Sequence, residues 1–277
     1  MRTRVFRAMG TTVELHVEAD HAERAFDAAE AEFERLEQVM SRFRPDSELS
    51  RLNDAGTLAV SSDLAEVVTL AVEARERTGG SFDPTVHDAV VGAGYDRTFE
   101  ALPPDRDRDP KPAPCLGGVE VTGRRVSIES GFRLDLGGIG KGYAAERVAE
   151  LLALTGPSLV SAGGDVAVRG VPAEGSWAVA VDESLTLGLE RGGLATSGTG
   201  GRRWRLGGAS QHHLIDPRTG SPARTDVVRV TAVAGDAVEA EVLAKTLLLG
   251  GSAAAVAASV PAVILTEDGR TLTTGGL

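Results

Sequence analysis

The 277-residue sequence is poor in several kinds of residue, and each shortage excludes a class of protein. A single cysteine, Cys115, excludes an internal disulfide and any paired-cysteine metal or redox motif. No apolar run approaches the length of a membrane span, and the first residues lack the apolar segment of a signal peptide. We therefore expect a cytoplasmic protein without membrane insertion, in which Cys115 is a small core residue rather than a reactive thiol.

Positive charge is also scarce, because 29 Lys and Arg residues stand against 40 Asp and Glu, a net charge of −11. Nucleic-acid-binding proteins need stripes of Lys and Arg, so nucleic acid is not an expected partner, although a local basic pocket for a small anion stays open. Aromatic residues make up only 4%, whereas glycine occupies 34 positions. Such an excess of glycine indicates tight turns or close backbone approaches.

The remaining composition is that of a globular protein, with 42% hydrophobic and 25% charged residues. We expect a single domain over residues 1–277, in which the segment 101–114 forms an exposed loop rich in Pro, Asp and Arg. Hydrophobic periodicity predicts helices at 21–38, 63–77, 141–155 and 237–249, the second begun by a capping-box-like pair of Asp63 and Glu66. It predicts one strand in 4–18 and further strands at 119–121, 125–128, 132–134, 158–160, 165–168, 176–181, 227–233 and 262–265. This mixture favours the α+β class.

The densest candidate for chemistry is Leu-Asp-Leu-Gly-Gly-Ile-Gly-Lys-Gly-Tyr at 134–143. A strand that runs through a glycine turn into a helix exposes backbone amides to an anion, and Lys141 adds a point charge. The Walker A pattern fails, because Gly142 follows the lysine and Asp135 takes the place of the first glycine. The dinucleotide pattern GxGxxG fails at Tyr143. A plain glycine-rich turn remains the alternative.

Three further stretches offer polar groups, each with a structural alternative. For residues 212–220, His-His-Leu-Ile-Asp-Pro-Arg-Thr-Gly, chemistry alone favours a turn with an exposed histidine pair. Ser197 offers a hydroxyl but is no nucleophile elbow, because Ala195 stands where GxSxG needs glycine. The loop at 80–85 presents either an aromatic ring and a carboxylate or simply a helix stop.

In combination and order, these stretches resemble the ApbE family of FAD:protein FMN transferases, from Met9 to about Gly251. The matching stretches are MGTTVELHV at 9–17, MSRFRPDSELSRLN at 40–53, GGSFDPTV at 79–86, LDLGGIGKGYAAERV at 134–148, SLVSAGGDVAV at 158–168, LATSG at 194–198, HHLIDPRTGSPA at 212–223 and AVEAEVLAKTLLLGG at 237–251.

The resemblance implies an ApbE-like α+β fold, with mixed or antiparallel sheets, flanking helices and two subdomains around a flavin cleft. It also implies an enzyme that uses FAD and Mg²⁺, transfers FMN to a Thr or Ser hydroxyl of a partner flavoprotein, and releases AMP. Two alternatives stay open: an FAD hydrolase that gives FMN and AMP, and a repurposed, metal-poor protein that binds flavin or another small molecule.

The resemblance further implies the site residues. His213 would lie near the reacting phosphate, and carboxylates such as Asp135 lie close enough in the motif to take part, although the sequence does not choose the catalytic base. Most family members have tyrosine where this chain has Phe43, so ring stacking is kept while a phenolic hydrogen bond is lost. The residues expected to contact FAD are Met9, Phe43, Ser81, Phe82, Asp83, Asp135, Lys141 and Ile215.

The chain departs from the family at the metal site. There the resemblance implies Mg²⁺ ligands from the carbonyl of Gly138 and from Asp and Thr of a D-x-x-x-T segment, whose positions here hold Glu241 and Lys245. A glutamate can still bind a cation, whereas a protonated lysine repels one, and Thr246 points about 100° away on a helix. One hypothesis places the Lys245 ammonium in the position of the metal. The alternative treats both side chains as surface charges and binds Mg²⁺ through Gly138, Glu241 and water.

Overall fold

The computed structural model describes residues 1–103, 105–182 and 184–277, and its centre is an eight-stranded sheet. The strand order is β1-β2-β7-β8-β11-β16-β17-β18, and every neighbouring pair is antiparallel. The strands are β1 (Arg2–Ala8), β2 (Thr11–Val17), β7 (Ser158–Ala162), β8 (Asp165–Arg169), β11 (Gly192–Gly198), β16 (Val227–Ala234), β17 (Ala262–Thr266) and β18 (Thr271–Thr274).

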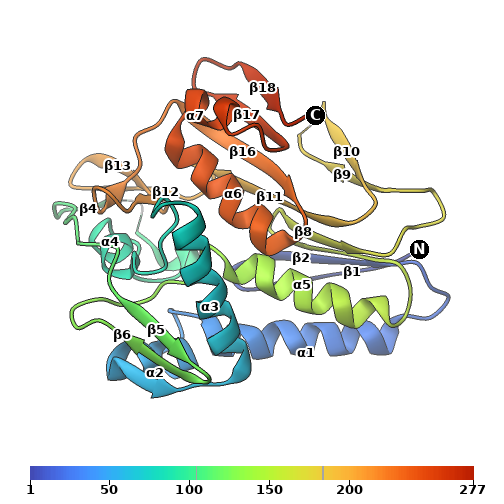
Figure 1. Cartoon of the computed structure of the whole chain (residues 1–277), viewed down its shortest axis with the longest axis horizontal. Helices are drawn as coiled ribbons and strands as arrows, with labels where there is room; N and C mark the ends of the chain where they lie inside the picture. The colour runs from blue at the N-terminus through green and yellow to red at the C-terminus, as the bar shows by residue number, and fades with distance from the viewer. Residues whose placement is uncertain (104, 183) are drawn as a thin grey trace.

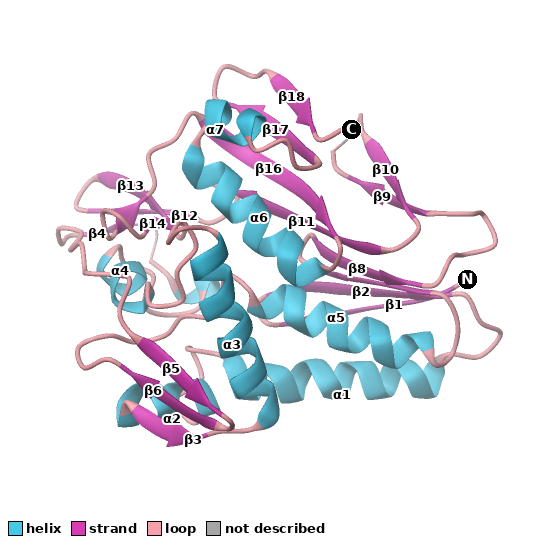
Figure 2. Cartoon of the chain, viewed as in Figure 1, coloured by secondary structure: helices cyan, strands magenta, loops and turns pink. Residues whose placement is uncertain are grey.

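Three helices lie side by side across one face of this sheet, in the order α1 (Glu23–Met40), α5 (Gly140–Ala153) and α6 (Ala237–Gly250) (Figures 1 and 2). Apolar residues recur along α1 at helical spacing, and the stripe they form is buried against the sheet and α5. This layer holds the largest core cluster of the described chain.

Most of the smaller elements lie at one end of this layer (Figures 1 and 2). The helices are α2 (Glu48–Ala55), α3 (Ser62–Arg77), α4 (His87–Gly92) and α7 (Ser252–Ala257), with a short 3₁₀ turn at Phe99–Ala101. The small sheets are β3-β6-β5, β13-β12-β4, β10-β9 and β14-β15. Their strands are β3 (Thr57–Ala59), β4 (Asp105–Arg106), β5 (Val119–Thr122), β6 (Arg125–Ile128), β9 (Trp177–Ala180), β10 (Thr186–Leu189), β12 (Arg203–Leu206), β13 (Ala209–His212), β14 (Ile215–Asp216) and β15 (Ser221–Pro222). Strands β9 and β10 lie at the other end of the layer, whereas α7 packs beside β17 and β18.

The structure confirms the α+β class and most predicted elements, with three local corrections. Residues 4–18 form parts of two strands, because a turn at Met9 and Gly10 folds them into a hairpin. Residues 132–134 are not a strand, because the Asn53 side chain takes both backbone groups of Leu134, at 2.8 and 2.9 Å. Helix α3 is capped by Ser61, whose hydroxyl accepts from the Leu64 amide, and not by the pair predicted.

The segment 101–114 is mostly exposed, as predicted, and contributes the short strand β4; Pro104 lies outside the described residues. Cys115 packs beside a small apolar cluster, and burial raises the pKa of its thiol to about 12. Within the described residues, no helix combines the length and the apolar character that a bilayer crossing requires.

Candidate active site

A cleft of about 330 Å³ opens where the β1–β2 turn, the start of α5 and the segment after β13 meet. The structure brings the predicted site residues together on its wall, with the exception of Glu241, which is buried behind it. Those on the wall are Met9, Phe43, Ser81, Phe82, Asp83, Asp135, Gly138, Lys141, His213, Ile215 and Lys245.

Met9 reaches the cleft through an unusual backbone conformation. It has φ of 51° and is followed by Gly10 at 67°, so both central residues of the two-residue hairpin loop adopt positive φ. Such loops match the twist of the flanking strands, but a non-glycine residue rarely adopts positive φ. The Met9 amide donates to the carboxylate of Glu37 at 2.7 Å, which ties the turn to α1. The hairpin therefore presents Met9 to the cleft in a fixed position.

One end of the cleft is built around an arginine that the sequence analysis did not single out. The Arg42 guanidinium lies 4.1 Å from the ring centre of Phe43 and 4.7 Å from that of Tyr95. It also forms an ion pair with Asp135 at 2.8 Å, and both side chains are more than nine-tenths buried. Because a planar guanidinium can stack and pair at once, Arg42 fixes two rings and one carboxylate together.

Two amides of the glycine turn are already taken by carboxylates of the chain and are not open to an anion. The Gly137 amide donates to Asp135 at 2.7 Å, and the Gly142 amide donates to Oε2 of Glu241 at 2.9 Å. A carboxylate from α6 thus occupies the electropositive start of α5. Only glycine fits at position 142, because a Cβ would lie 2.6 Å from the Ala237 carbonyl oxygen of α6. This close approach of the two helices brings Glu241 to the turn.

Beside that turn lies a buried cluster of two ammonium groups and two carboxylates. Lys141 pairs with Asp165 and, at 2.7 Å, with Oε1 of Glu241. Nζ of Lys245 lies 3.4 Å from the same Oε1 and donates to the carbonyl oxygen of Gly138 at 3.1 Å. Burial alone would lower the pKa of Lys141, but the two carboxylates raise it, whereas burial raises the pKa of Asp165 and lowers that of Lys245.

The histidine pair is divided between two roles, so the expectation of an exposed pair is wrong. His212 is buried, its Nε2 bonds the Ala223 carbonyl at 3.0 Å, and its Nδ1 accepts from the Leu214 amide. His213 turns into the cleft, and its buried Nδ1 has no hydrogen-bond partner among the described residues. Burial and the nearby cation of Arg202 lower the pKa of His213 well below 6.5. Its imidazole is therefore neutral at pH 7.

Asp83 differs from the other predicted residues, because its carboxylate serves the fold. It accepts from the Thr85 hydroxyl at 2.7 Å and from the Leu116 amide at 2.6 Å, and its side chain is fully buried. The neighbouring Ser81 and Phe82 follow the end of α3 and line the cleft. The loop at 80–85 is thus both a helix stop and a cleft wall.

Four residues of the site were not found by sequence reasoning. Arg42 precedes Phe43, and Asp165 opens β8, so both lie within stretches that carried the family resemblance. Tyr95 and Arg202 lie outside those stretches, and nothing in the sequence distinguished them. Arg202 lines the cleft and donates to the Gly10 carbonyl at 3.1 Å rather than to a carboxylate of the described chain.

The fold is an α+β fold, and its cleft is lined by the aromatic rings of Phe43 and Tyr95 and by the cations of Lys141 and Lys245. The model of the ApbE family matches residues 9–263, and the chain belongs to that family.

Solved structures and named relatives agree with this assignment. The FAD:protein FMN transferase of Salmonella typhimurium is 30% identical over 260 residues, which are 85% of this chain and 74% of that protein. The crystal structure of the ApbE protein from Thermotoga maritima has a TM-score of 0.87 at 25% identity, over 99% of this chain and 97% of that one. The flavin transferase ApbE from Vibrio cholerae has a TM-score of 0.79 at 26% identity, over 99% and 97%.

Proposed function

We propose that this chain is an FAD:protein FMN transferase, which moves FMN from FAD to a Thr or Ser hydroxyl of a partner flavoprotein and releases AMP. One observation carries the proposal: all the residues that the family resemblance assigns to FAD binding line the same cleft. The names of the relatives favour transfer over the hydrolase and over a repurposed protein. The proposal treats residues 1–277 as one domain, with the cleft between two subdomains.

The cleft suits a dinucleotide in size and in the kinds of group that line it. Ligand-binding clefts commonly enclose about 300–1,000 Å³, and this one lies at the lower end of that range. Met9, Phe43 and Tyr95 offer apolar and aromatic surface for a ring system. Lys245 and Arg202 offer positive charge for the pyrophosphate. We assign Asp135 a positioning role, because its carboxylate is already engaged by Arg42.

The reaction exchanges one bond to phosphorus for another, and it requires these residues to stabilise charge and to accept a proton. The acceptor oxygen forms a bond to the phosphorus of the FMN half, the bond from that phosphorus to the bridging oxygen breaks, and AMP leaves with the electron pair. Fixed cations stabilise the negative charge that develops on the phosphate oxygens. The hydroxyl proton must go to a base, and we assign this role to the neutral imidazole of His213, which lines the cleft.

The Mg²⁺ that the family resemblance implies does not fit the residues present. Both oxygens of Glu241 already accept hydrogen bonds, and the Gly138 carbonyl accepts one from Lys245. Lys245 stands where the resemblance implies a threonine ligand, and a protonated amine cannot coordinate a cation. No step of the proposed reaction therefore depends on a metal.

The test combines the purified chain, FAD and a flavoprotein subunit from the same genome, with the Thr→Ala variant of its acceptor residue as the control. We expect AMP to appear in step with covalently bound flavin on the acceptor, detected by fluorescence in a denaturing gel. His213→Asn should slow the transfer by about 10²-fold or more, the usual loss when a general base is removed. AMP released equally with the Thr→Ala acceptor would identify a hydrolase instead.

A further inference from the structure

The chain contains only three lysines, and two of them, Lys141 and Lys245, meet at the cleft; the third, Lys111, is exposed. The other 26 cationic side chains are arginines. An ammonium group is a compact point charge with three donors, whereas a guanidinium is a broad planar fork. At the buried end of this cleft the chain therefore places the cationic group that is closest in shape to a metal ion.

The contacts of Lys245 are those expected of a cation in a site built from oxygen atoms. Its Nζ contacts the Gly138 carbonyl oxygen at 3.1 Å and Oε1 of Glu241 at 3.4 Å, and its side chain is 17% exposed. One oxygen belongs to the glycine turn and the other to α6, and these two segments are more than 100 residues apart in the sequence. The ammonium thus connects the turn to α6.

Charge balance leaves no requirement for a divalent ion. Two carboxylates, Asp165 and Glu241, face two ammonium groups, Lys141 and Lys245, so the buried cluster is neutral as it stands. A Mg²⁺ ion needs near-octahedral oxygen ligands at about 2.0–2.1 Å, and a protonated amine cannot supply one. Binding such an ion would require Lys245 to leave both of its oxygen contacts.

The adjacent threonine does not restore a ligand. The Thr246 hydroxyl donates to the Val242 carbonyl at 2.9 Å, so it bonds within α6 and not to Gly138 or Glu241. The arrangement therefore contains one carbonyl and one carboxylate oxygen around an ammonium, rather than an incomplete metal site.

We infer that the Lys245 ammonium permanently occupies the position at which a divalent cation would bind, so that this chain binds the pyrophosphate of its dinucleotide without a metal. The inference rests on the proposed function for the identity of the ligand. Arg202, on the same cleft wall and without a carboxylate contact in the described chain, supplies a second positive charge. Two of the three donors of the Lys245 ammonium contact Gly138 and Glu241, and the third is available to a phosphate oxygen, whereas Arg202 adds a net positive charge.

The first experiment measures metal binding in the absence of FAD. The chain is freed of metal with a chelator and titrated with Mn²⁺, and the free ion is followed by electron paramagnetic resonance. We expect no Mn²⁺ site in the natural chain and one in Lys245→Thr, which replaces the ammonium by a hydroxyl ligand; Lys111→Thr, the same change at the exposed lysine, should bind none. A stoichiometric Mn²⁺ site in the natural chain, or none in Lys245→Thr, would overturn the inference.

The second experiment measures FAD affinity by flavin fluorescence, with a chelator or with Mg²⁺. Lys245→Thr should bind FAD at least tenfold more weakly than the natural chain in chelator and recover when Mg²⁺ is added. Lys245→Met, which removes the charge without adding a ligand, should weaken binding in both conditions. Recovery of Lys245→Met by Mg²⁺ would contradict the inference. A natural chain that binds no FAD in either condition would refute the proposed function, while the Mn²⁺ titration would still decide the role of Lys245.

Discussion

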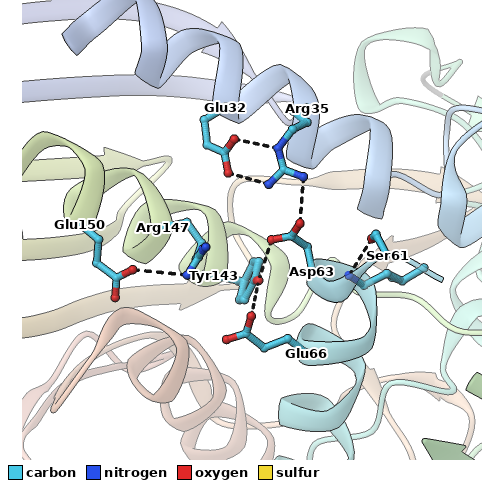
Figure 3. A network of polar contacts seen from close by, with 9 residues as sticks. Glu32, Arg35, Ser61, Asp63, Glu66, Tyr143, Arg147 and Glu150 are labelled. Carbon is cyan, nitrogen blue, oxygen red and sulfur yellow. Dashed lines mark hydrogen bonds and ion pairs between the residues drawn. The ribbon is translucent and has the colours of Figure 1, made fainter. Parts of the chain in front are cut away.

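Helix α5 carries charged clusters on two of its faces, and the contrast between them separates function from stability. Lys141 turns toward the cleft, where its partners are 2% and 1% exposed. Tyr143, about 200° further around the helix, turns toward α3 and contacts Asp63 and Glu66 (Figure 3). Arg35 of α1 completes that second network and is 46% exposed. Charged side chains of the same kinds are therefore buried beside the cleft but partly exposed to solvent in the network that connects α1, α3 and α5.

The difference predicts how strongly each region responds to a lost partner. A buried carboxylate without its cation keeps its full desolvation cost, whereas a partly exposed one is rehydrated. The cleft cluster should therefore dominate both stability and ligand binding, and the network of Figure 3 should affect stability alone.

The largest effect is expected for Lys141→Met, which leaves Asp165 and Glu241 to share the single cation of Lys245. We expect the free energy of unfolding, measured by urea denaturation, to fall by about 3–5 kcal/mol. Adding Glu241→Gln should recover part of the loss, because the double variant removes one of the unpaired charges. A loss below about 1 kcal/mol would show that the cluster is hydrated and not buried as described.

Arg42→Met should have the next largest effect, because it removes the guanidinium that pairs with Asp135 and stacks on Phe43 and Tyr95. We expect a loss of about 2–3 kcal/mol in stability and weaker FAD binding in the same protein. Arg42→Lys keeps the charge but not the planar group, so it should restore stability more than it restores FAD affinity. Equal recovery of both would indicate that stacking contributes nothing.

The effect of Asp63→Asn on stability should depend on pH, because Asp63 is charged in the network between α1, α3 and α5. The hydrogen bond from Arg35 lowers the pKa of Asp63 below its ordinary value of 3.8. A carboxyl whose pKa is lower in the folded state stabilises the protein at pH values above its unfolded-state pKa. This stabilisation is lost as the pH falls through the folded-state pKa. The variant should therefore be about 1–2 kcal/mol less stable than the natural chain near neutral pH, and the difference should shrink below about pH 4. A gap that does not change with pH would assign the effect to packing.

The smallest effect is expected for Arg147→Ala, which breaks a contact of 3.5 Å with Glu150 on the exposed side of α5. Both side chains are about half exposed, and such pairs contribute at most about 0.5 kcal/mol. Thermal unfolding should barely change, and FAD affinity should not change at all. A larger loss of stability would mean that the second network extends further along α5 than its contacts indicate.

The sequence predicted the parts of this molecule that depend on neighbours along the chain. The apolar stripe of α1 and the alternation in β2 can be seen locally, and so can the turn that follows Asp216. The motif stretches also contain the predicted site residues, all of which except Glu241 line one cleft, and their roles stay predictions.

What could not be predicted depends on contacts between distant segments. The residues at 132–134 have the composition of a strand, but Asn53, 81 residues away, takes the backbone groups of Leu134. Arg42 was overlooked because its partner Asp135 is far along the chain. The strand order has the same origin, since β2 pairs with β7 although α1 to α5 lie between them in the sequence. Local periodicity contains no information on such pairings.

The most direct test of the account is the affinity of the natural chain for FAD, measured by calorimetry in chelator and again in Mg²⁺. If Lys245 holds the position of the metal, the two dissociation constants should agree within about twofold, or ~0.4 kcal/mol. Binding that is at least tenfold tighter with Mg²⁺, about 1.4 kcal/mol, would contradict the account. It would show that Lys245 gives way to the ion when FAD binds.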